Sequence, residues 1–305
     1  MNRKVLNSPR LFELKRKRRR VFLGKIFFFL FLFLIFLALG GLLWRWKEIN
    51  IDQIEIIGNK VIDSTLIKKE IEEELSGYYF WIFPKSNVLL YPKNDIKNRL
   101  NNKFKRLDNI SFNIKNEKIL EILLQERKAI YTWCGENPAL YSAVVLDDKE
   151  LENQCYFIDE NGYLFDRAPY FSGEVYFKFF GKLNNDKNKD NTNFIGSYFL
   201  PDIFYRMISF RDDVSSFGIK SSSFFLKEDG DIELYLSSSK TSNNLPKIIF
   251  KKDDDLLKVA ENLQAAITTE PLKSDFEKKY SSLLYIDLRF NNKIYYKFFT
   301  QEKDI

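Results

Sequence analysis

The chain has 305 residues, of which 45% are hydrophobic and 30% charged, so it can form two ordinary domains and has the composition of a folded protein. It contains no histidine, which excludes the Ser-His-Asp triad and every metal site that depends on imidazole ligands. Two cysteines are too few for a zinc site of four thiolates. Enzyme functions are therefore at a disadvantage. The sequence also has no phosphate-binding glycine loop, no metal-ligand spacing and no cofactor fingerprint, so we expect a protein that is not an enzyme and has no metal ion, no cofactor and no small-molecule substrate.

Basic residues are concentrated at the N-terminus. Residues 1–25 carry ten Lys and Arg against the single acid Glu13, a balance of +9, so the remainder of the +6 chain has a charge of 6 − 9 = −3. A slightly acidic bulk repels phosphate, which argues against nucleic acid as a partner. A basic run before an apolar segment is typical of the cytoplasmic side of a membrane protein.

Residues 26–44, IFFFLFLFLIFLALGGLLW, contain no charged side chain. At 1.5 Å per residue, a helix of this length nearly matches the roughly 30 Å hydrocarbon layer of a membrane. The run predicts a single transmembrane helix, with residues 1–25 as a cytoplasmic tail, 45–50 as a linker and the rest outside. A cleavable signal peptide is the alternative, because small residues occur at Ala38 and Gly40, but such peptides have shorter apolar runs.

A strand and a helix follow the linker. Ile51 to Ile57 is predicted to be a strand, and Gly58-Asn59 provides a turn that tolerates positive φ. Asp63 or Ser64 can cap the helix that follows, in which apolar residues recur at every fourth position: Ile67, Ile71 and Leu75.

A second helix and two strands complete a β-α-α-β-β unit over residues 51–127. Pro92 precedes the helix, and Asn94 or Asp95 can cap it. The two strands turn at Asn116-Glu117, and their apolar positions alternate: Ile110, Phe112 and Ile114, then Leu120, Ile122 and Leu124.

Residues 128–305 predict a larger, mostly antiparallel β domain. The polar tracts 184–193 and 237–244 are expected to be exposed loops. A helix is expected from Asp253 to Ile267, and a closing hairpin turns at Asn291-Asn292. The apolar positions of that hairpin alternate along both strands: Leu284, Ile286, Leu288 and Phe290, then Ile294, Tyr296 and Phe298.

Several short motifs occur in one order along the chain. Glu126-Arg127 ends the third strand before Trp133, and residues 155–165 read CYFIDENGYLF, while residues 285–290 read YIDLRF. With the β-α-α-β-β order, which resembles a POTRA domain, these motifs make the chain similar to the FtsQ/DivIB family of cell-division proteins. The family often has Pro and Ala after Glu-Arg, where this chain has Lys128-Ala129-Ile130.

The resemblance implies an α+β protein with one N-terminal transmembrane helix, located in the cell (inner) membrane at the division septum. It implies a bitopic scaffold of the division machinery, the divisome, that holds FtsB- and FtsL-like partners and so helps to control septal wall synthesis. The septal wall synthase is a further candidate partner. The partner site that it implies comprises Tyr285, Arg289 and the 293–299 strand, with its anchors Ile294, Tyr296 and Phe298. The alternative is that these aromatics are ordinary sheet core.

The resemblance also implies a second recognition surface on the POTRA-like domain, at its edge strand. Nearby, Gly77 to Phe83 reads GYYFWIF, with five aromatic residues in seven. Any of these that remain exposed would mark contact with a partner or with the membrane surface, because large apolar patches rarely stay bare.

Two other functions remain open. A POTRA-containing outer-membrane or secretion assembly factor is one, although few residues are left for a barrel. A membrane-anchored wall hydrolase is the other, with Asp159-Glu160 as the acid and base. However, Asp159-Glu160-Asn161-Gly162 is more typical of a hairpin turn, and the S-x-x-K match at Ser237 to Lys240 lies in a polar tract without a K-T-G partner.

Cys134 and Cys155 are the only cysteines. On the expected topology they lie in an oxidising compartment, where a disulfide between them would contribute about 3 kcal/mol through loop closure. The alternative is a pair of buried free thiols.

Overall fold

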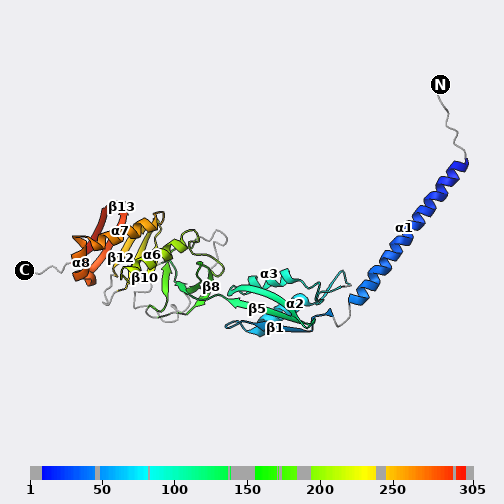
Figure 1. The fold of residues 1–305 in the computed structure, drawn as a ribbon, viewed down its shortest axis with the longest axis horizontal. Helices are drawn as coiled ribbons and strands as arrows, with labels where there is room; N and C mark the ends of the chain where they lie inside the picture. Colours follow the sequence, from blue (N-terminus) through cyan, green and yellow to red (C-terminus); the bar gives the residue numbers. More distant parts are fainter. Residues whose placement is uncertain are drawn as a thin grey trace, which may run out of the picture. The chain divides into compact units, whose positions relative to one another are not determined.

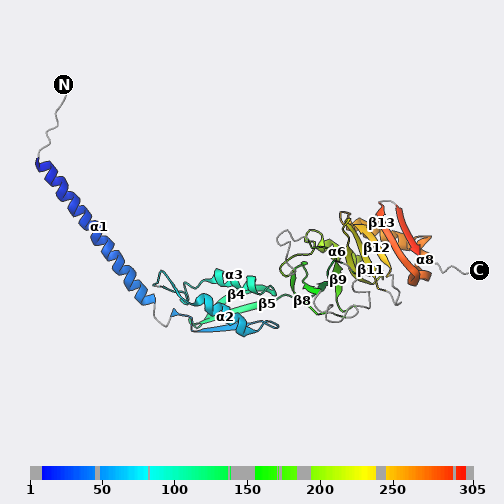
Figure 2. The same ribbon diagram turned by 180° about the vertical axis from the view of Figure 1, so that it is seen from behind.

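The computed structural model describes residues 9–44, 49–81, 83–136, 138, 155–169, 171, 174–183, 194–237, 245–290 and 293–299. The tract 184–193, most of the tract 237–244 and the turn at Asn291-Asn292 lie outside the described residues. The chain divides into two compact units, residues 1–126 (unit 1) and 127–305 (unit 2), whose ribbons are shown in Figures 1 and 2. The fold is α+β, with a large sheet in unit 2.

The first element is the helix α1, Pro9–Trp44, whose side chains are described from Glu13 to Phe36. Three basic residues, Arg19, Arg20 and Lys25, lie among the described side chains of positions 19–36, and charged side chains are costly in the hydrocarbon layer. Within the described residues, no helix is both long enough and apolar enough to cross a membrane. This finding corrects the expectation of a transmembrane helix over residues 26–44.

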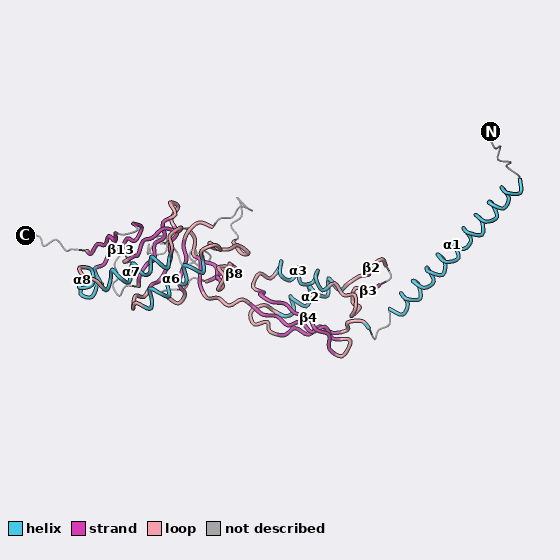
Figure 3. The backbone as a smooth tube through the Cα atoms, turned by 45° about the horizontal axis from the view of Figure 1, so that its top comes forward, coloured by secondary structure: helices cyan, strands magenta, loops and turns pink. Residues whose placement is uncertain are grey.

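Unit 1 contains a three-stranded sheet in the order β1-β5-β4, with β1 at Gln53–Ile57, β4 at Leu107–Lys115 and β5 at Ile119–Glu126. β1 is parallel to β5, and β5 is antiparallel to β4. Helices α2, Ser64–Leu75, and α3, Lys93–Lys103, lie between β1 and β4 in the chain. A small antiparallel hairpin, β2 at Tyr78–Tyr79 and β3 at Phe83–Pro84, separates the two helices and is labelled in Figure 3.

The apolar spacing explains how unit 1 packs. The Asp63 carboxylate caps α2 by accepting the N–H of Thr65 at 2.8 Å. Pro92, rather than Asn94 or Asp95, occupies the N-cap position of α3. Side chains of the helices and the sheet then form one buried core that includes Ile67, Ile71, Leu75, Ile96, Leu100, Leu120, Ile122 and Leu124.

The loop between β1 and α2 is held against the end of β5. Gly58 has a φ of 98°, and a Cβ placed on it would lie 2.1 Å from the Leu124 carbonyl oxygen. In this loop, the backbone N–H groups of Lys60, Val61 and Ile62 all donate hydrogen bonds to the Glu126 carboxylate. Burial opposes ionisation of Glu126, but these N–H groups outweigh it and hold its pKa below the usual range. The Gly58-Asn59 turn therefore needs glycine for both conformation and space.

Unit 2 contains a nine-stranded sheet in the order β14-β13-β12-β11-β10-β9-β6-β7-β8. Most neighbours are antiparallel, but β6–β9, β9–β10 and β12–β13 are parallel. The strands are β6 Tyr131–Trp133, β7 Cys155–Ile158, β8 Leu164–Ala168, β9 Phe177–Phe180, β10 Ser221–Leu226, β11 Asp231–Leu236, β12 Lys247–Lys251, β13 Leu283–Phe290 and β14 Lys293–Phe298.

Three helices pack with this sheet to form the main core: α6 Phe204–Ser216, α7 Leu256–Thr268 and α8 Leu272–Lys279. A 3-10 turn, Tyr280–Ser282, leads from α8 into β13. The expected helix is α7, whose N-cap Asp255 accepts the N–H of Leu257 at 3.2 Å. Core side chains come from alternate positions of the strands, such as Phe179, Phe224, Leu234, Ile248 and Ile286. The residues between them lie on the opposite face of the sheet, called here the outer face.

Cys134 and Cys155 form a disulfide at the start of β7, and both lie in a small second core with Ala168 and Phe180. The bridge closes a loop of 21 residues in sequence separation. We expect the double variant C134S/C155S to lower the free energy of unfolding of unit 2 by about 3 kcal/mol. Urea titration of the oxidised wild type and the variant measures this loss. A matching midpoint for both proteins would contradict it, and thiol labelling without reductant should find no free thiol in the wild type.

Candidate partner-binding site on the closing hairpin

The closing hairpin lies at one edge of the nine-stranded sheet. Among the described strands, β14 pairs with β13 alone, so its other edge has no strand beside it. An open edge offers backbone N–H and C=O groups that can pair with an extended segment of another chain.

The two faces of β14 differ. Ile294, Tyr296 and Phe298 are half-buried and pack against the main core, so for these three anchors the structure places the side chains in the sheet core. Lys293, Tyr295 and Lys297 alternate with them and are exposed, and Tyr295 is 49% exposed. The accessible side chains of this strand are therefore two lysines that flank a tyrosine.

The pairing of β13 with β14 is irregular, and this changes which residues are buried. Register shifts occur between Leu283 and Tyr285 and between Asp287 and Phe290. As a result Leu283, and not Leu284, joins Ile286 and Leu288 in the main core. Phe290, expected on the same face, is instead 51% exposed, and its ring lies edge-on against Tyr295 at 5.2 Å between centroids.

Arg289 is held by two carboxylates on the outer face. Its guanidinium donates to Asp287 at 2.6 Å and 2.9 Å, and to Asp231 on β11 at 2.5 Å. Both acids are buried, so the arginine compensates charges that would otherwise be costly. Burial opposes ionisation of Asp287, but the Arg289 guanidinium outweighs it and holds the pKa of that carboxyl below its usual range. Arg289 on β13 therefore forms an ion pair with β11, although β12 lies between these two strands in the sheet.

A second ion pair lies on the same face. Lys247 on β12 donates to the buried Glu233 on β11 at 2.8 Å, and the Tyr235 hydroxyl donates to the same carboxylate at 2.8 Å. Burial and the Glu233 charge together raise the pKa of Tyr235 well above its usual range. Tyr285 pairs in register with Lys247 on one side and with Lys297 on the other. Tyr285 thus lies between this ion pair and the exposed strand.

The sequence analysis included Tyr295 only as an unnamed member of the candidate strand and expected Phe290 on the buried face, whereas the structure exposes both side chains. The alternation of β14 could have indicated Tyr295, because the residue between two core positions faces outward. No comparable signal exists for Phe290, whose exposure follows from the register shift.

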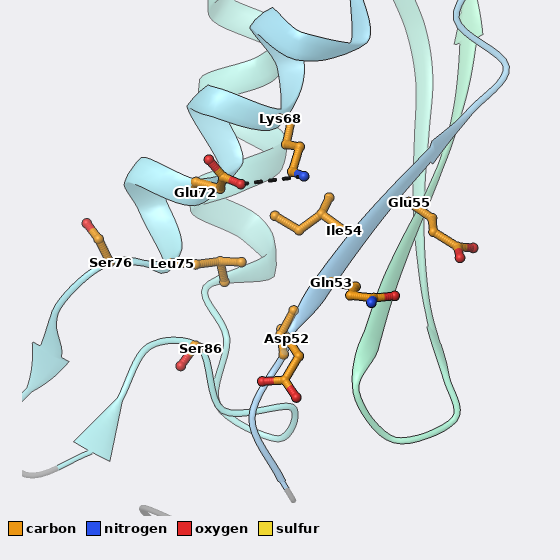
Figure 4. A pocket seen from close by; sticks show the side chains of 10 residues that line it. Asp52, Gln53, Ile54, Glu55, Lys68, Glu72, Leu75, Ser76 and Ser86 are labelled. Carbon is orange, nitrogen blue, oxygen red and sulfur yellow. Dashed lines mark ion pairs between the residues drawn. The ribbon is translucent and has the colours of Figure 1, made fainter. Parts of the chain in front are cut away.

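Unit 1 has a groove of about 440 Å³ between its edge strand and α2. Figure 4 shows Ile54 of β1 and Leu75 of α2 on its two sides, with Asp52 and Ser86 at one end. Glu72 and Lys68 form an ion pair at 3.9 Å on the helix side. Among the described strands, β1 pairs with β5 alone, so this groove lies beside a second open edge.

Two of the residues considered for catalysis, Asp159 and Ser237, have structural partners. Asp159 accepts the N–H groups of Asn161 and Tyr163 at 2.8 Å and 3.0 Å, and it pairs with Arg127 at 2.5 Å. These contacts are those of a carboxylate that stabilises a turn. The Ser237 hydroxyl donates to Glu174 at 2.9 Å, while Ser238 to Lys240 lie outside the described residues.

No protein-family model matches the sequence, and no curated protein matches it.

Proposed function

We propose that this chain is a non-enzymatic scaffold of the bacterial cell-division machinery that holds FtsB- and FtsL-like partner proteins at the septum and so helps to control septal wall synthesis. The observation that carries this proposal is the open edge of β14, with Lys293, Tyr295 and Lys297 exposed beside it. The order β1-α2-α3-β4-β5 and the YIDLRF strand, which is β13, support it through the resemblance to the FtsQ/DivIB family.

The proposed mechanism is strand addition. A partner segment in extended form would pair with the backbone of β14, and backbone hydrogen bonds would supply affinity. Side chains on one face of that segment would meet Tyr295 and the two lysines, and those on the other face would extend the half-buried row of Ile294, Tyr296 and Phe298. The partner strand is therefore expected to alternate apolar residues with acidic or polar ones.

The proposed location is the cell membrane at the septum, with the sheet of unit 1 and all of unit 2 outside the cytoplasm. The disulfide supports this compartment, because such bonds persist where the surroundings are oxidising. The exposed apolar side chains of α1 and the basic residues before them support attachment of the N-terminal segment to a membrane. The groove beside β1 is the proposed second recognition surface.

We expect Tyr295→Glu to weaken capture of the FtsB- and FtsL-like proteins of the same cell at least about 30-fold, because a charge would replace the exposed aromatic anchor. Titration of the purified full chain with those partners measures the affinity. Tyr205→Glu, at an 81% exposed position on α6, is the matched control and should bind normally. Equal affinity of the Tyr295 variant and the wild type would contradict the site.

A depletion experiment tests the function itself. Loss of the protein from its source cell should give filaments, and a fluorescent fusion should gather at midcell. Tyr295→Glu should fail to restore division although the protein is present in normal amount. Normal septa after depletion would contradict the division role.

A further inference from the structure

The tip of the β2–β3 hairpin carries two aromatic side chains that nothing in the described chain covers. Phe80 is 88% exposed and Trp81 is 91% exposed. Fully exposed aromatic pairs are unusual, because burying each ring removes a large apolar area from water. Their position at a turn makes the tip a projection and not a flat patch.

The backbone conformation of this turn is unfavourable for Phe80 and Trp81. Phe80 and Trp81 have φ angles of 49° and 61°, in the left-handed region. Glycine and asparagine adopt this conformation at low cost, whereas bulky residues in it are strained. A turn whose only role was to reverse the chain would gain stability from Asn-Gly at these positions. The side chains themselves are therefore the feature that the turn presents.

Lys85 is the charged residue of the hairpin. The segment from Gly77 to Lys85 contains no acidic residue, whereas Glu72, Glu73 and Glu74 lie near the end of the preceding helix α2. The Lys85 ammonium lies 5.8 Å from the centre of the Tyr79 ring, so an aromatic surface and a cation are presented together. Aromatic rings flanked by lysine are the composition that the headgroup region of a membrane favours.

The hairpin also lies close in the chain to the apolar α1. At its base Ile51 donates its N–H to the Ser86 carbonyl at 2.8 Å, and Val88 donates to the Ile49 carbonyl at 3.0 Å. Ile49 follows the last residue of α1, Trp44, by five positions, a distance of at most about 18 Å in extended chain. A membrane that holds the N-terminal segment would therefore lie close to the base of the hairpin.

We propose that Phe80 and Trp81 insert into the headgroup region of an anionic membrane and form a second lipid contact for unit 1. This inference rests on the membrane location proposed above. Insertion of the tip would limit the orientations that unit 1 can take on the membrane, which would favour presentation of its groove to one side.

The test uses the full chain and vesicles of phosphatidylethanolamine and phosphatidylglycerol, with and without bromine on the lipid acyl chains. Bromine quenches tryptophan on contact, and the difference in emission between wild type and W81F isolates Trp81 from Trp44, Trp46 and Trp133. Brominated vesicles should remove at least about half of this difference. The variant F80S/W81S should bind vesicles about tenfold more weakly, because two large apolar surfaces are lost. The control Y205S, at the exposed site on α6, should bind as the wild type does.

The outcomes separate this inference from the membrane location. If the chain binds vesicles but the Trp81 emission is not quenched, the lipid contact is overturned and the location stands. If the chain does not bind vesicles at all, both are overturned. If F80S/W81S binds vesicles normally but no longer gathers at the septum, the tip contacts a protein and the lipid contact is overturned. The quenching measurement uses the wild-type tip, so it does not depend on how the serine variant folds.

Discussion

Replacing Arg289 with alanine is expected to lower the free energy of unfolding of unit 2 by about 3 kcal/mol, because it leaves two buried carboxylates without their cation. Asp231 and Asp287 both lose their ion pair, and three hydrogen bonds from the guanidinium disappear with it. Urea titration of the full chain, followed through the signal of unit 2, measures the loss. Lys279→Ala removes an exposed ion pair with Asp275 on α8 and is the control, with an expected change within about 0.5 kcal/mol.

The ion pair between Arg289 and Asp287 also predicts how the stability of unit 2 depends on pH. The folded pKa of Asp287 is lowered, so its contribution to stability is present above the unfolded value of about 4 and is lost as the pH falls through the folded pKa. In Arg289→Ala the guanidinium that causes most of this lowering of the Asp287 pKa is absent, and the backbone N–H of position 289 remains. The difference in stability between wild type and variant should therefore shrink below about pH 4. A difference that stayed constant from pH 7 to pH 3 would show that Arg289 acts through packing alone.

Gly58→Ala is expected to destabilise unit 1 by about 4 kcal/mol, since the new methyl group would overlap the backbone of β5. The nearest atom to the added Cβ is the Leu124 carbonyl oxygen at 2.1 Å, and backbone cannot move aside as a flexible side chain can. The displacement would also break the hydrogen bonds that Glu126 accepts from the loop. Hydrogen exchange of the β5 amides in the full chain reports the loss locally.

Gly77→Ala is the matched control for this prediction. Its φ of 92° is close to that of Gly58, but no atom lies within 4 Å of its added Cβ. It should therefore show only the cost of the left-handed backbone, about 1 kcal/mol. Equal effects of the two substitutions would mean that conformation, and not the close approach to β5, explains the requirement for glycine at position 58.

Local patterns predicted unit 1 well because its elements are decided by local signals. The spacing of Ile67, Ile71 and Leu75 identifies the buried face of α2, and the Asp63 cap marks its start. The alternation of Leu120, Ile122 and Leu124 likewise identifies the buried face of β5. The pairing of β1 with β5, which are far apart in sequence, depends on tertiary contacts that no local pattern contains.

Unit 2 was harder to predict, for identifiable reasons. Helix α6 has Phe204, Met207, Phe210 and Val214 at helical spacing, but its surrounding aromatic residues suggested strands. The sequence did not identify which side chains of the candidate strand β14 are accessible. The register shifts in β13 arise from pairing with β14, and so the exposure of Phe290 could be seen only in the folded chain.

The transmembrane expectation shows the limit of a length argument. The apolar run was counted from Ile26 to Trp44, whereas the described side chains of positions 19–36 include the basic Arg19, Arg20 and Lys25, and no helix within the described residues is long and apolar enough to cross a membrane.

The two lysines beside the open edge of β14 bear on how the protein behaves at high local concentration. If two copies met edge to edge, Lys293 and Lys297 of one strand would face the lysines of the other. Like charges on adjoining strands repel, and edge lysines are a common protection against aggregation. Crowding of many copies would then leave the edges unoccupied and available to a strand of complementary charge.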